Sequence, residues 1–374
     1  MSLLIALLFA QLRLQNEQLV SRATEMTGDV RASGCHGHLL VAWRDGNGIA
    51  AAADGRKLVI STSTRGTPAV ACGNDSWLVI WPSEDFGVDG RRVALDGGLL
   101  ATAPLFRGPF GASEVAAAYG DNGFLMAWTD GVTVRVTRVN DAGKALDAPP
   151  LSVGLTGVFV APRIVWNGST FFLAWAEDRT NPLSPKPTRF WGTRVSAGGK
   201  VDAVSLPMIE AGAGLRGLQP SVTTNGDRIT IAWVAEHGAQ TCVDVAQVND
   251  ARKVLVAPKQ LRCSGDDGTP VFDEAEIRWS RRELILVWRE LRSDFSSVLR
   301  VARLDERATL VDPSFDLLSR PGAASLGPGL ASTSAGVAAA YFSTLPPPEE
   351  TTAGVWMRVV EQDPAPARRR VVGR

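Results

Sequence analysis

The sequence predicts an all-β fold: a seven-bladed β-propeller with four-stranded antiparallel blades, closed into a ring by an N-terminal strand. Three observations lead to this prediction. A short apolar phrase ending in an aromatic residue recurs along the chain, a turn signal precedes it at a constant distance, and an Arg-Val motif with a glycine turn follows it. Together they define one supersecondary unit that repeats.

The recurring phrase is clearest at residues 171–175, which read Phe-Phe-Leu-Ala-Trp. Copies lie at 39–43, 78–81, 124–128, 229–233 and 284–288, and a seventh copy at 337–341 ends in Tyr. The closing aromatics recur about every 50 residues, which is typical of propeller blades. Each phrase is β-branched and aromatic and too short for an amphipathic helix. We expect the closing aromatics to be core residues, in particular Trp128, Trp175, Trp233 and Trp288.

A second position lies nine residues before the closing aromatic. It holds Cys72, Tyr119, Trp166, Thr224, Trp279 and Ser332. Between the two positions stands a turn signal such as Asn167-Gly168. Asn-Gly pairs supply the positive φ that tight hairpins need. Each repeat is therefore expected to open with a hairpin of strands A and B.

Strands C and D follow in each repeat. Strand C ends near an Arg-Val pair with a glycine a few residues later, as at Arg92, Arg138 and Arg194. Strand D is the apolar stretch before the next repeat, as at 58–61, 150–153, 259–263 and 315–318. The last repeat has a strand C at 354–360 but no strand D, whereas 19–21 resembles a surplus strand D. We predict that these two segments pair and close the ring, which removes open sheet edges.

Composition limits the function classes. The net charge is zero and the isoelectric point is about 6.9, which argues against a nucleic-acid partner because such binders carry a basic stripe. We expect a signal segment at residues 1–14, one propeller at 15–361 and a disordered tail rich in Pro and Arg at 362–374. The apolar run at 1–10 resembles a signal-peptide core and is too short to cross a bilayer. The alternative is a buried N-terminal helix or strand. We predict a secreted, periplasmic or cell-surface monomer without a transmembrane helix.

The longest insertions fall in the B–C and D–A connections, which share one face of a propeller, at 176–191, 264–276 and 343–352. Loops on a rigid scaffold often carry function. We predict a ligand-binding surface there, with Phe190 and Trp191 as exposed aromatic anchors. The alternative is that both rings cover their own blade. The candidate ligand-binding residues are Glu177, Asp178, Phe190, Trp191, Asp266, Asp267, Asp273 and Glu274.

A carboxylate follows strand B in six repeats. These acids are Asp45, Glu84 or Asp85, Asp130, Glu177 or Asp178, Glu236 and Glu290. They form either an acidic ring at the channel mouth or a set of ion pairs within single blades. No cofactor is expected, although the acidic stretch at 266–276 leaves Ca²⁺ open, because Ca²⁺ takes six to eight oxygen ligands. The histidines His36, His38 and His237 suggest no three-ligand zinc set.

The hairpin with its trailing acid and Arg-Val-x-x-x-Gly resembles the blade repeats of secreted bacterial β-propellers, and it is distantly similar to sialidase-type blades. The Ser-x-Asp-x-Gly-x-x-Trp boxes of sialidases are absent, and the only tyrosines, Tyr119 and Tyr341, occupy repeat positions. The resemblance covers roughly residues 15–361 and implies the architecture alone. Because no catalytic motif is present, we predict an exported module that binds a protein or glycan ligand, with no catalytic residue assigned. The alternative is a carbohydrate-active enzyme that uses two loop carboxylates.

The chain contains four cysteines. Cys242 begins strand C of the fifth repeat and Cys263 ends its strand D. The two lie symmetrically about the turn near residues 250–254, so we predict that they face each other and form a disulfide. Cys35 and Cys72 stand at matching ends of strand A in adjacent blades. A separation above about 7 Å would prevent a bridge between them, so their pairing stays open, as does a reduced state for all four.

Overall fold

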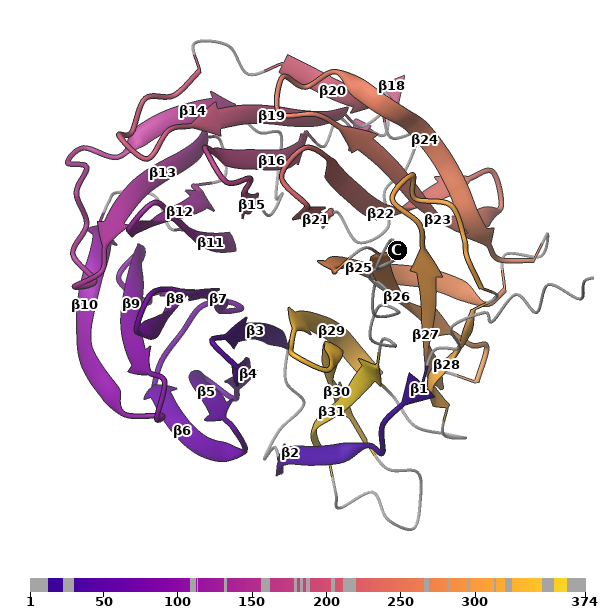
Figure 1. Cartoon of the computed structure of the whole chain (residues 1–374), viewed down its shortest axis with the longest axis horizontal. Helices are drawn as coiled ribbons and strands as arrows, with labels where there is room; N and C mark the ends of the chain where they lie inside the picture. Colours follow the sequence, from indigo (N-terminus) through magenta and orange to yellow (C-terminus); the bar gives the residue numbers. More distant parts are fainter. Residues whose placement is uncertain are drawn as a thin grey trace, which may run out of the picture.

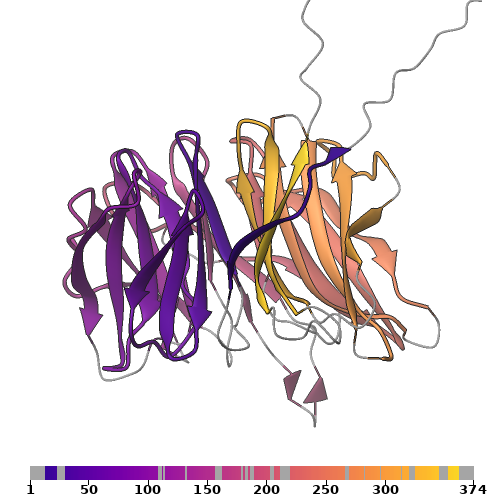
Figure 2. The same ribbon diagram turned by 90° about the horizontal axis from the view of Figure 1, so that it is seen from below.

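The computed structural model forms a ring of seven β-sheets around a central axis (Figure 1). It describes residues 13–22, 30–107, 112, 114–130, 133–155, 162–177, 180–181, 184–185, 189–202, 206–210, 220–265, 269–281, 283–294, 296–312, 314–319, 325–344 and 353–361. Every regular element in these residues is a strand. Seen from the side, the strands of each blade run between the two faces of the ring (Figure 2). The predicted all-β, seven-bladed propeller is thus confirmed.

The blades follow the chain in order, each with its innermost strand first. Blade 1 comprises β3 (Arg31–Cys35), β4 (His38–Asp45), β5 (Gly48–Ala53) and β6 (Arg56–Ser61). Blade 2 comprises β7 (Ala69–Cys72), β8 (Ser76–Pro82), β9 (Gly87–Ala94) and β10 (Leu99–Arg107). Blade 3 comprises β11 (Glu114–Gly120), β12 (Gly123–Thr129), β13 (Thr133–Asn140) and β14 (Leu151–Leu155).

The later blades carry the insertions. Blade 4 comprises β15 (Arg163–Trp166), β16 (Phe171–Glu177), β19 (Arg189–Val195) and β20 (Leu206–Glu210), with a small hairpin of β17 (Thr180–Asn181) and β18 (Ser184–Pro185) that projects from one face (Figure 2). Blade 5 comprises β21 (Ser221–Thr224), β22 (Ile229–His237), β23 (Gln240–Val248) and β24 (Val254–Cys263). Blade 6 comprises β25 (Val271–Ser280), β26 (Glu283–Leu291), β27 (Ser297–Leu304) and β28 (Phe315–Ser319).

Blade 7 is closed by the two ends of the chain. It contains β29 (Ser325–Ser332), β30 (Gly336–Ser343) and β31 (Gly354–Glu361), and its outer positions are taken by β1 (Arg13–Leu14) and β2 (Gln18–Arg22). Leu19 pairs with Trp356 and Leu14 with Val360, both antiparallel. The predicted pairing of 19–21 with 354–360 is confirmed. It leaves no blade with only three strands.

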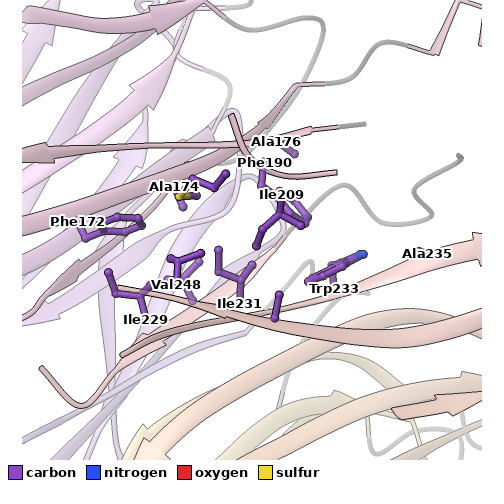
Figure 3. Close-up of a cluster of buried hydrophobic side chains, with 13 residues drawn as sticks. Phe172, Ala174, Ala176, Phe190, Ile209, Ile229, Ile231, Trp233, Ala235 and Val248 are labelled. Atoms are coloured by element: carbon purple, nitrogen blue, oxygen red, sulfur yellow. The ribbon is translucent and has the colours of Figure 1, made fainter. Parts of the chain in front are cut away.

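The core lies between the blades rather than inside any one of them. Figure 3 shows one such cluster, in which Phe172 and Phe190 of blade 4 pack against Ile231 and Trp233 of blade 5. The predicted core role of the closing aromatics is confirmed. They are at most 2% exposed: Trp43, Trp81, Trp128, Trp175, Trp233, Trp288 and Tyr341. A blade cannot bury these faces alone, so the ring is the unit that folds.

Both cysteine pairs are disulfides. Cys242 and Cys263 are directly opposite in the β23–β24 register, as predicted, with Cα atoms 4.0 Å apart. Cys35 and Cys72 are also bonded, with Cα atoms 5.2 Å apart. The sequence leaves this pairing open, and the structure decides it because the inner strands of adjacent blades converge toward the axis.

Among the described residues, no helix has the length and apolar character needed to cross a membrane.

Candidate functional site: the axial channel

The innermost strands of the blades surround a channel along the ring axis. Two cavities occupy it, of about 330 and 130 Å³. Both are lined by Ala32, Val70, Ala117, Ile164 and Arg278. They are therefore consecutive parts of one channel that meet at this shared ring. The larger cavity lies toward the A–B hairpins and the smaller one toward the starts of the inner strands.

The larger cavity is lined by the second repeat position of every blade. These residues are Gly34, Cys72, Tyr119, Trp166, Thr224, Trp279 and Ser332. Blades 3, 4 and 6 place an aromatic ring there, whereas the others place a small residue or a disulfide. The periodic position found in the sequence is thus the rim of this cavity. Its composition divides the rim into an aromatic part and a polar part.

The aromatic rings of the rim are held by the hairpins that carry them. Tyr119 packs edge-on against Phe124 with ring centroids 4.8 Å apart, and Trp166 packs against Phe171 at 4.7 Å. The indole of Trp166 also lies against Gly120, where a Cβ atom would come within 2.1 Å of it. Only glycine leaves room for the indole at that place. The rings of Tyr119 and Trp166 are therefore held in place by their neighbours.

Tyr119 stays neutral in this setting. Burial, followed by the nearby carboxylates of Asp141 and Asp75, raises the pKa of Tyr119 to about 12. Its hydroxyl is buried and has no hydrogen-bond partner of acceptable geometry among the described residues. A buried hydroxyl without a partner costs free energy. It offers both a donor and an acceptor at the rim.

Arg278 provides the charge of the larger cavity. Its Nε donates a hydrogen bond to Ser332 Oγ at 3.2 Å, and no carboxylate oxygen of the described residues lies within 4 Å of its guanidinium nitrogens. Burial lowers the pKa of Arg278, and the charge of Glu276 opposes that shift. An arginine has five N–H donors and stays charged in proteins. Most of these donors therefore face the channel without a protein acceptor.

The strand that carries Arg278 is tied to both neighbouring blades. The backbone N–H of Ile277 donates to Ser221 Oγ and that of Trp279 to Thr223 Oγ1, each at 2.9 Å. Ser332 Oγ donates to the Trp279 carbonyl at 3.2 Å. Inner strands of adjacent blades do not form a ladder, so these hydroxyls satisfy edge groups that would otherwise face the channel. They also hold Arg278 in position.

The channel as a whole is cationic. The smaller cavity is lined by Arg31, Arg163, Arg278 and Glu276, and the larger one adds no further charged side chain. Three arginines and one glutamate give a net charge of +2 in a protein whose total formal charge is zero. Low-dielectric walls strengthen such a field. Positive side chains thus outnumber negative ones among the described residues that line the two cavities.

The predicted loop surface lies on the face opposite the A–B hairpins. Phe190 is fully buried in the core between blades 4 and 5, with its ring 5.0 Å from that of Trp233. The prediction that Phe190 is an exposed anchor was wrong, because strand periodicity turns it inward. Trp191, the next residue, is partly exposed and lies opposite Trp175.

The acidic candidates divide into two groups. Asp273 accepts from Arg289 at 2.8 Å, and Glu274 pairs with the same arginine at 3.2 Å and accepts from the Gly327 N–H at 2.7 Å. These two acids are thus held in ion pairs within the ring. Asp178, Asp266 and Asp267 lie outside the described residues, as does the side chain of Glu177. The structure therefore leaves their predicted ligand role, and that of Ca²⁺, a prediction.

Carboxylates that follow strand B serve their own blades where the structure describes their pairs. Asp45 pairs with Lys57 at 3.2 Å and Asp130 with Arg135 at 2.7 Å. Glu290 pairs with Arg300 at 3.1 Å and accepts from Trp288 Nε1 at 3.1 Å. Of the two interpretations, these three acids follow the one in which each repeat stabilises itself.

Sequence reasoning missed the channel residues as a site. The second repeat position is evident in the sequence, but its recurrence indicates a structural role in the A–B hairpin. The signal that distinguishes it is its variation, since a purely structural position has no reason to alternate between Trp, Tyr, Thr and Ser. Arg278 has no sequence signal of its own, because strand A residues face the axis only once the ring has closed.

Comparison with known proteins identifies the fold. No protein-family model matches the sequence, and no curated protein sequence matches it. Solved propellers do match. A protein of unknown function from Dyadobacter fermentans has 13% identity and a TM-score of 0.56, with 94% of this chain and 99% of that chain covered.

Two further structures show how widely the fold is used. The β-propeller domain of the Trilobed protease from Pyrococcus furiosus, described as having an open velcro topology, has 10% identity and a TM-score of 0.54 over 91% of this chain and 95% of that one. A GH93 α-L-arabinofuranosidase of Fusarium graminearum, solved with arabinobiose, has 12% identity and a TM-score of 0.53 over 90% and 93%. At such identities the likeness concerns the fold alone.

Proposed function

We propose that the protein is a binding propeller that takes a small anion with a flat ring into its axial channel, from the face of the A–B hairpins. The observation that supports this most is Arg278. Its guanidinium faces a cavity of about 330 Å³ with one side-chain hydrogen bond, beside the rings of Trp166 and Trp279. Ligand pockets combine apolar walls with a few polar groups that fix orientation. An arginine recognises carboxylate or phosphate with two parallel hydrogen bonds.

Binding is favoured over glycoside hydrolysis by the residues that line the channel. A glycosidase needs two carboxyl groups about 5–10 Å apart across its site. Among the residues that the structure describes, no Asp, Glu or His lines the larger cavity, and Glu276 is the single acid of the smaller one. Glu276 is itself the acceptor of the Ser221 hydroxyl. The cavity chemistry thus supplies recognition groups but no pair of acids.

The binding test uses ring-bearing anions and their neutral counterparts. Benzoate and nicotinate would be titrated calorimetrically against the neutral benzyl alcohol and nicotinamide, with tryptophan fluorescence as a second readout because Trp166 and Trp279 line the cavity. We expect at least one anion to bind and its neutral counterpart to bind more weakly. Arg278→Gln should weaken binding by about tenfold to a hundredfold, as for loss of a hydrogen bond to a charged group.

The matched control is Arg307→Gln, which makes the same charge change at an exposed position of the same blade, outside the channel. It should leave affinity unchanged. Equal weakening by both variants would show a general charge effect and contradict a channel site. Failure of every anion to bind the folded protein would contradict the proposal as a whole.

We also infer that the protein works outside the cytoplasm. Its two disulfides support this, since disulfides persist mainly in oxidising compartments, and the apolar run at residues 1–10 resembles a signal-peptide core. Mass spectrometry of the protein recovered from the export compartment of an expression host should find a new N-terminus after Ala10. An intact Met1 in that fraction would contradict the inference.

A further inference from the structure

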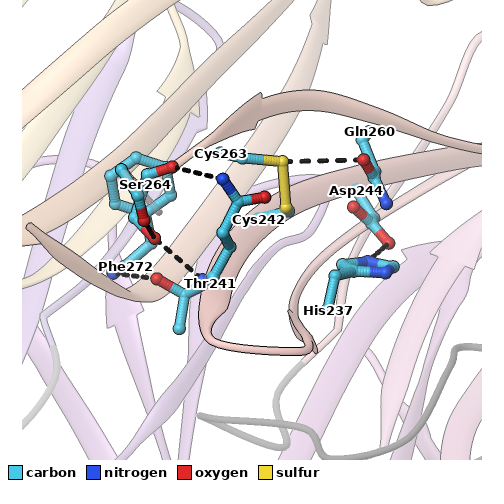
Figure 4. Close-up of a disulfide and its surroundings, with 10 residues drawn as sticks. His237, Thr241, Cys242, Asp244, Gln260, Cys263, Ser264 and Phe272 are labelled. Carbon is cyan, nitrogen blue, oxygen red and sulfur yellow. Dashed lines mark hydrogen bonds and ion pairs between the residues drawn. A yellow bond between two sulfur atoms is a disulfide. The ribbon is translucent and has the colours of Figure 1, made fainter. Parts of the chain in front are cut away.

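Blade 5 contains a second cluster of chemically active side chains, on the opposite face of the ring from the channel rim. Figure 4 shows His237 at the end of β22, Cys242 and Asp244 on β23, and Cys263 at the end of β24. The possible ligand atoms of His237, Cys242 and Asp244 all lie within 4.8 Å of one another. Sequence reasoning found no zinc set here, because its members come from three strands.

The strand register places all four side chains on one side of the blade. Cys242 lies opposite both Ala235 and Cys263. Directly opposed residues share a face, and so do residues two apart along a strand. His237 is two residues after Ala235, and Asp244 is two residues after Cys242. The four side chains therefore share one face of the blade, and Cys263 adjoins the other three through its bond to Cys242.

Asp244 is a buried acid whose polar contacts in this cluster are incomplete. It is 3% exposed, and its Oδ2 lies 2.9 Å from His237 Nε2, whereas its Oδ1 has no hydrogen-bond partner in the described part of the chain. Burial raises the pKa of Asp244, opposed by the hydrogen bond and charge of His237. No Lys or Arg of the described residues lies within 4 Å of it. A buried carboxylate with an unpartnered oxygen costs free energy unless a cation lies beside it.

We propose that His237, Cys242, Asp244 and Cys263 form a redox-gated site for a zinc-like divalent cation. While Cys242 and Cys263 are bonded to each other, neither can bind a metal as a thiolate. A dithiol reductant gives two electrons and two protons to the disulfide and becomes a disulfide itself, leaving Cys242 and Cys263 as thiols. The metal then displaces both thiol protons. Two thiolates, one imidazole nitrogen and one carboxylate oxygen complete a tetrahedral set of the kind that Zn²⁺ prefers.

Access to the site is compatible with exchange of a reductant and a metal. Cys263 lies on the outermost strand and is partly exposed, and the His237 side chain is 30% exposed. Asp244 and Cys242 lie beneath them and are buried. The other disulfide offers a contrast, because Cys35 and Cys72 have only the exposed His36 beside them and no carboxylate in their group. This second group offers three ligands and no carboxylate, so it is the weaker candidate for a metal site.

The test uses the full chain in a Cys35→Ser/Cys72→Ser background, so that only the blade 5 thiols remain. The protein would be reduced with a dithiol, freed of reductant without air, and titrated with Co²⁺. We expect one Co²⁺ per chain with the intense visible absorption of a tetrahedral thiolate complex, displaced by equimolar Zn²⁺. The oxidised protein should show no such band. Asp244→Asn and His237→Ala should each weaken binding by at least about tenfold.

Folding is checked by near-UV circular dichroism at each step. A reduced protein that is folded but binds no Co²⁺, or that binds equally well in both single variants, would overturn the proposal. If reduction unfolds the chain, recovery of the native spectrum on adding Zn²⁺ supports the site, because a metal that binds only the folded state stabilises it. Cys263→Ser gives a route without reductant: it keeps His237, Cys242 and Asp244, and a folded variant that ignores Co²⁺ also overturns the proposal.

Discussion

At the scale of single residues, the closing aromatics differ in how their polar atoms are satisfied. The indole N–H groups of Trp43, Trp128, Trp175 and Trp233 are buried and find no acceptor in the part of the chain that the structure describes. Trp288 instead donates to Glu290. In blade 7 the position is Tyr341, whose hydroxyl donates to Glu17 in the N-terminal segment. The change from Trp to Tyr thus supplies a polar contact to the segment that closes the ring.

Replacing a closing Trp should be much more damaging than replacing a Trp nearby. Trp175→Ala removes a fully buried side chain and should lower the free energy of unfolding by about 3–5 kcal/mol. The matched control is Trp191→Ala, because Trp191 lies directly opposite on β19 but is partly exposed. Urea unfolding monitored by circular dichroism measures both. Equal costs would contradict the core role of the repeat position.

The ion pair of Arg138 and Asp147 makes a prediction about pH. Burial alone would raise the pKa of Asp147, but hydrogen bonds from the Arg138 side chain and backbone and the arginine charge outweigh it and hold that pKa below its usual value. A carboxyl whose folded pKa is lowered contributes stability above its unfolded pKa and loses that contribution as the pH falls through the folded pKa. The Asp147 carboxylate is only 9% exposed.

Asp147→Asn should therefore cost about 1–3 kcal/mol near pH 7. The difference from the parent protein should shrink below roughly pH 4, the range of an ordinary aspartate. Denaturant unfolding at several pH values measures it. A cost that stays constant down to the lowest pH at which the protein folds would show that the charge of Asp147 plays no part.

At the scale of elements, the arginine of the Arg-Val motif links strand C to the C–D turn of its own blade and, in two cases, to the next blade. The arginine near the end of strand C pairs with an aspartate after the C–D turn, at 2.7 Å for Arg138–Asp147 and Arg194–Asp202 and at 2.6 Å for Arg303–Asp312. Two of these arginines also reach the C–D turn of the next blade. Arg138 donates to the Ala197 carbonyl and Arg194 to Asp250, each at 3.4 Å. In blades 3 and 4 the motif thus connects strand C both to its own C–D turn and to the next blade.

The glycine of this motif is required for two reasons. Gly199 has φ of 85°, and a Cβ atom there would lie 2.8 Å from Arg138 Nε, which Asp147 holds in place. Gly199→Ala should therefore cost more than the strain of positive φ alone, about 1 kcal/mol or more. The control is Gly168→Ala, where φ is 100° but the surrounding space is open. Thermal unfolding that ranks the two variants equally would contradict the inter-blade contact.

At the scale of the whole molecule, the ring is closed by strand pairing in blade 7. A disulfide links the next two blades along the chain, blades 1 and 2. Strands β1 and β2 complete blade 7, and the contact between β29 and β3 joins blade 7 to blade 1. The disulfide of Cys35 and Cys72 then ties the inner strands of blades 1 and 2. The chain passes from β2 of blade 7 to β3 of blade 1, and a cluster that includes Trp43 and Phe342 packs the two blades together.

Removing the closing strands should destabilise the entire ring. Deletion of residues 1–24 removes β1 and β2 and exposes the edge of β31. We expect it to lower the melting temperature by roughly 5 °C or more, or to abolish soluble expression. Deletion of residues 1–12 keeps both strands and is the matched control. A ring that lacks 1–24 but melts like the control would contradict closure by the N-terminal strand.

The repeat architecture was accessible from the sequence because it rests on local rules. Residues such as Trp175 and turns such as Asn167-Gly168 recur in every blade, so period and turn chemistry predict the strands, the blade count and the surplus strand at 19–21. The disulfide of Cys242 and Cys263 followed in the same way, because it lies within one hairpin whose turn sets the register. All of these features depend on residues close together in the chain.

Features that join different blades were decided only by the tertiary structure. The convergence of inner strands brings Cys35 within bonding distance of Cys72 and gathers Trp166, Trp279 and Arg278 around one cavity. The packing of blade 4 against blade 5 encloses Phe190 between them. No short-range pattern encodes these neighbours, because their distances depend on the radius of the ring and the twist of its sheets. The blades follow from local sequence, whereas the channel exists only after the ring has closed.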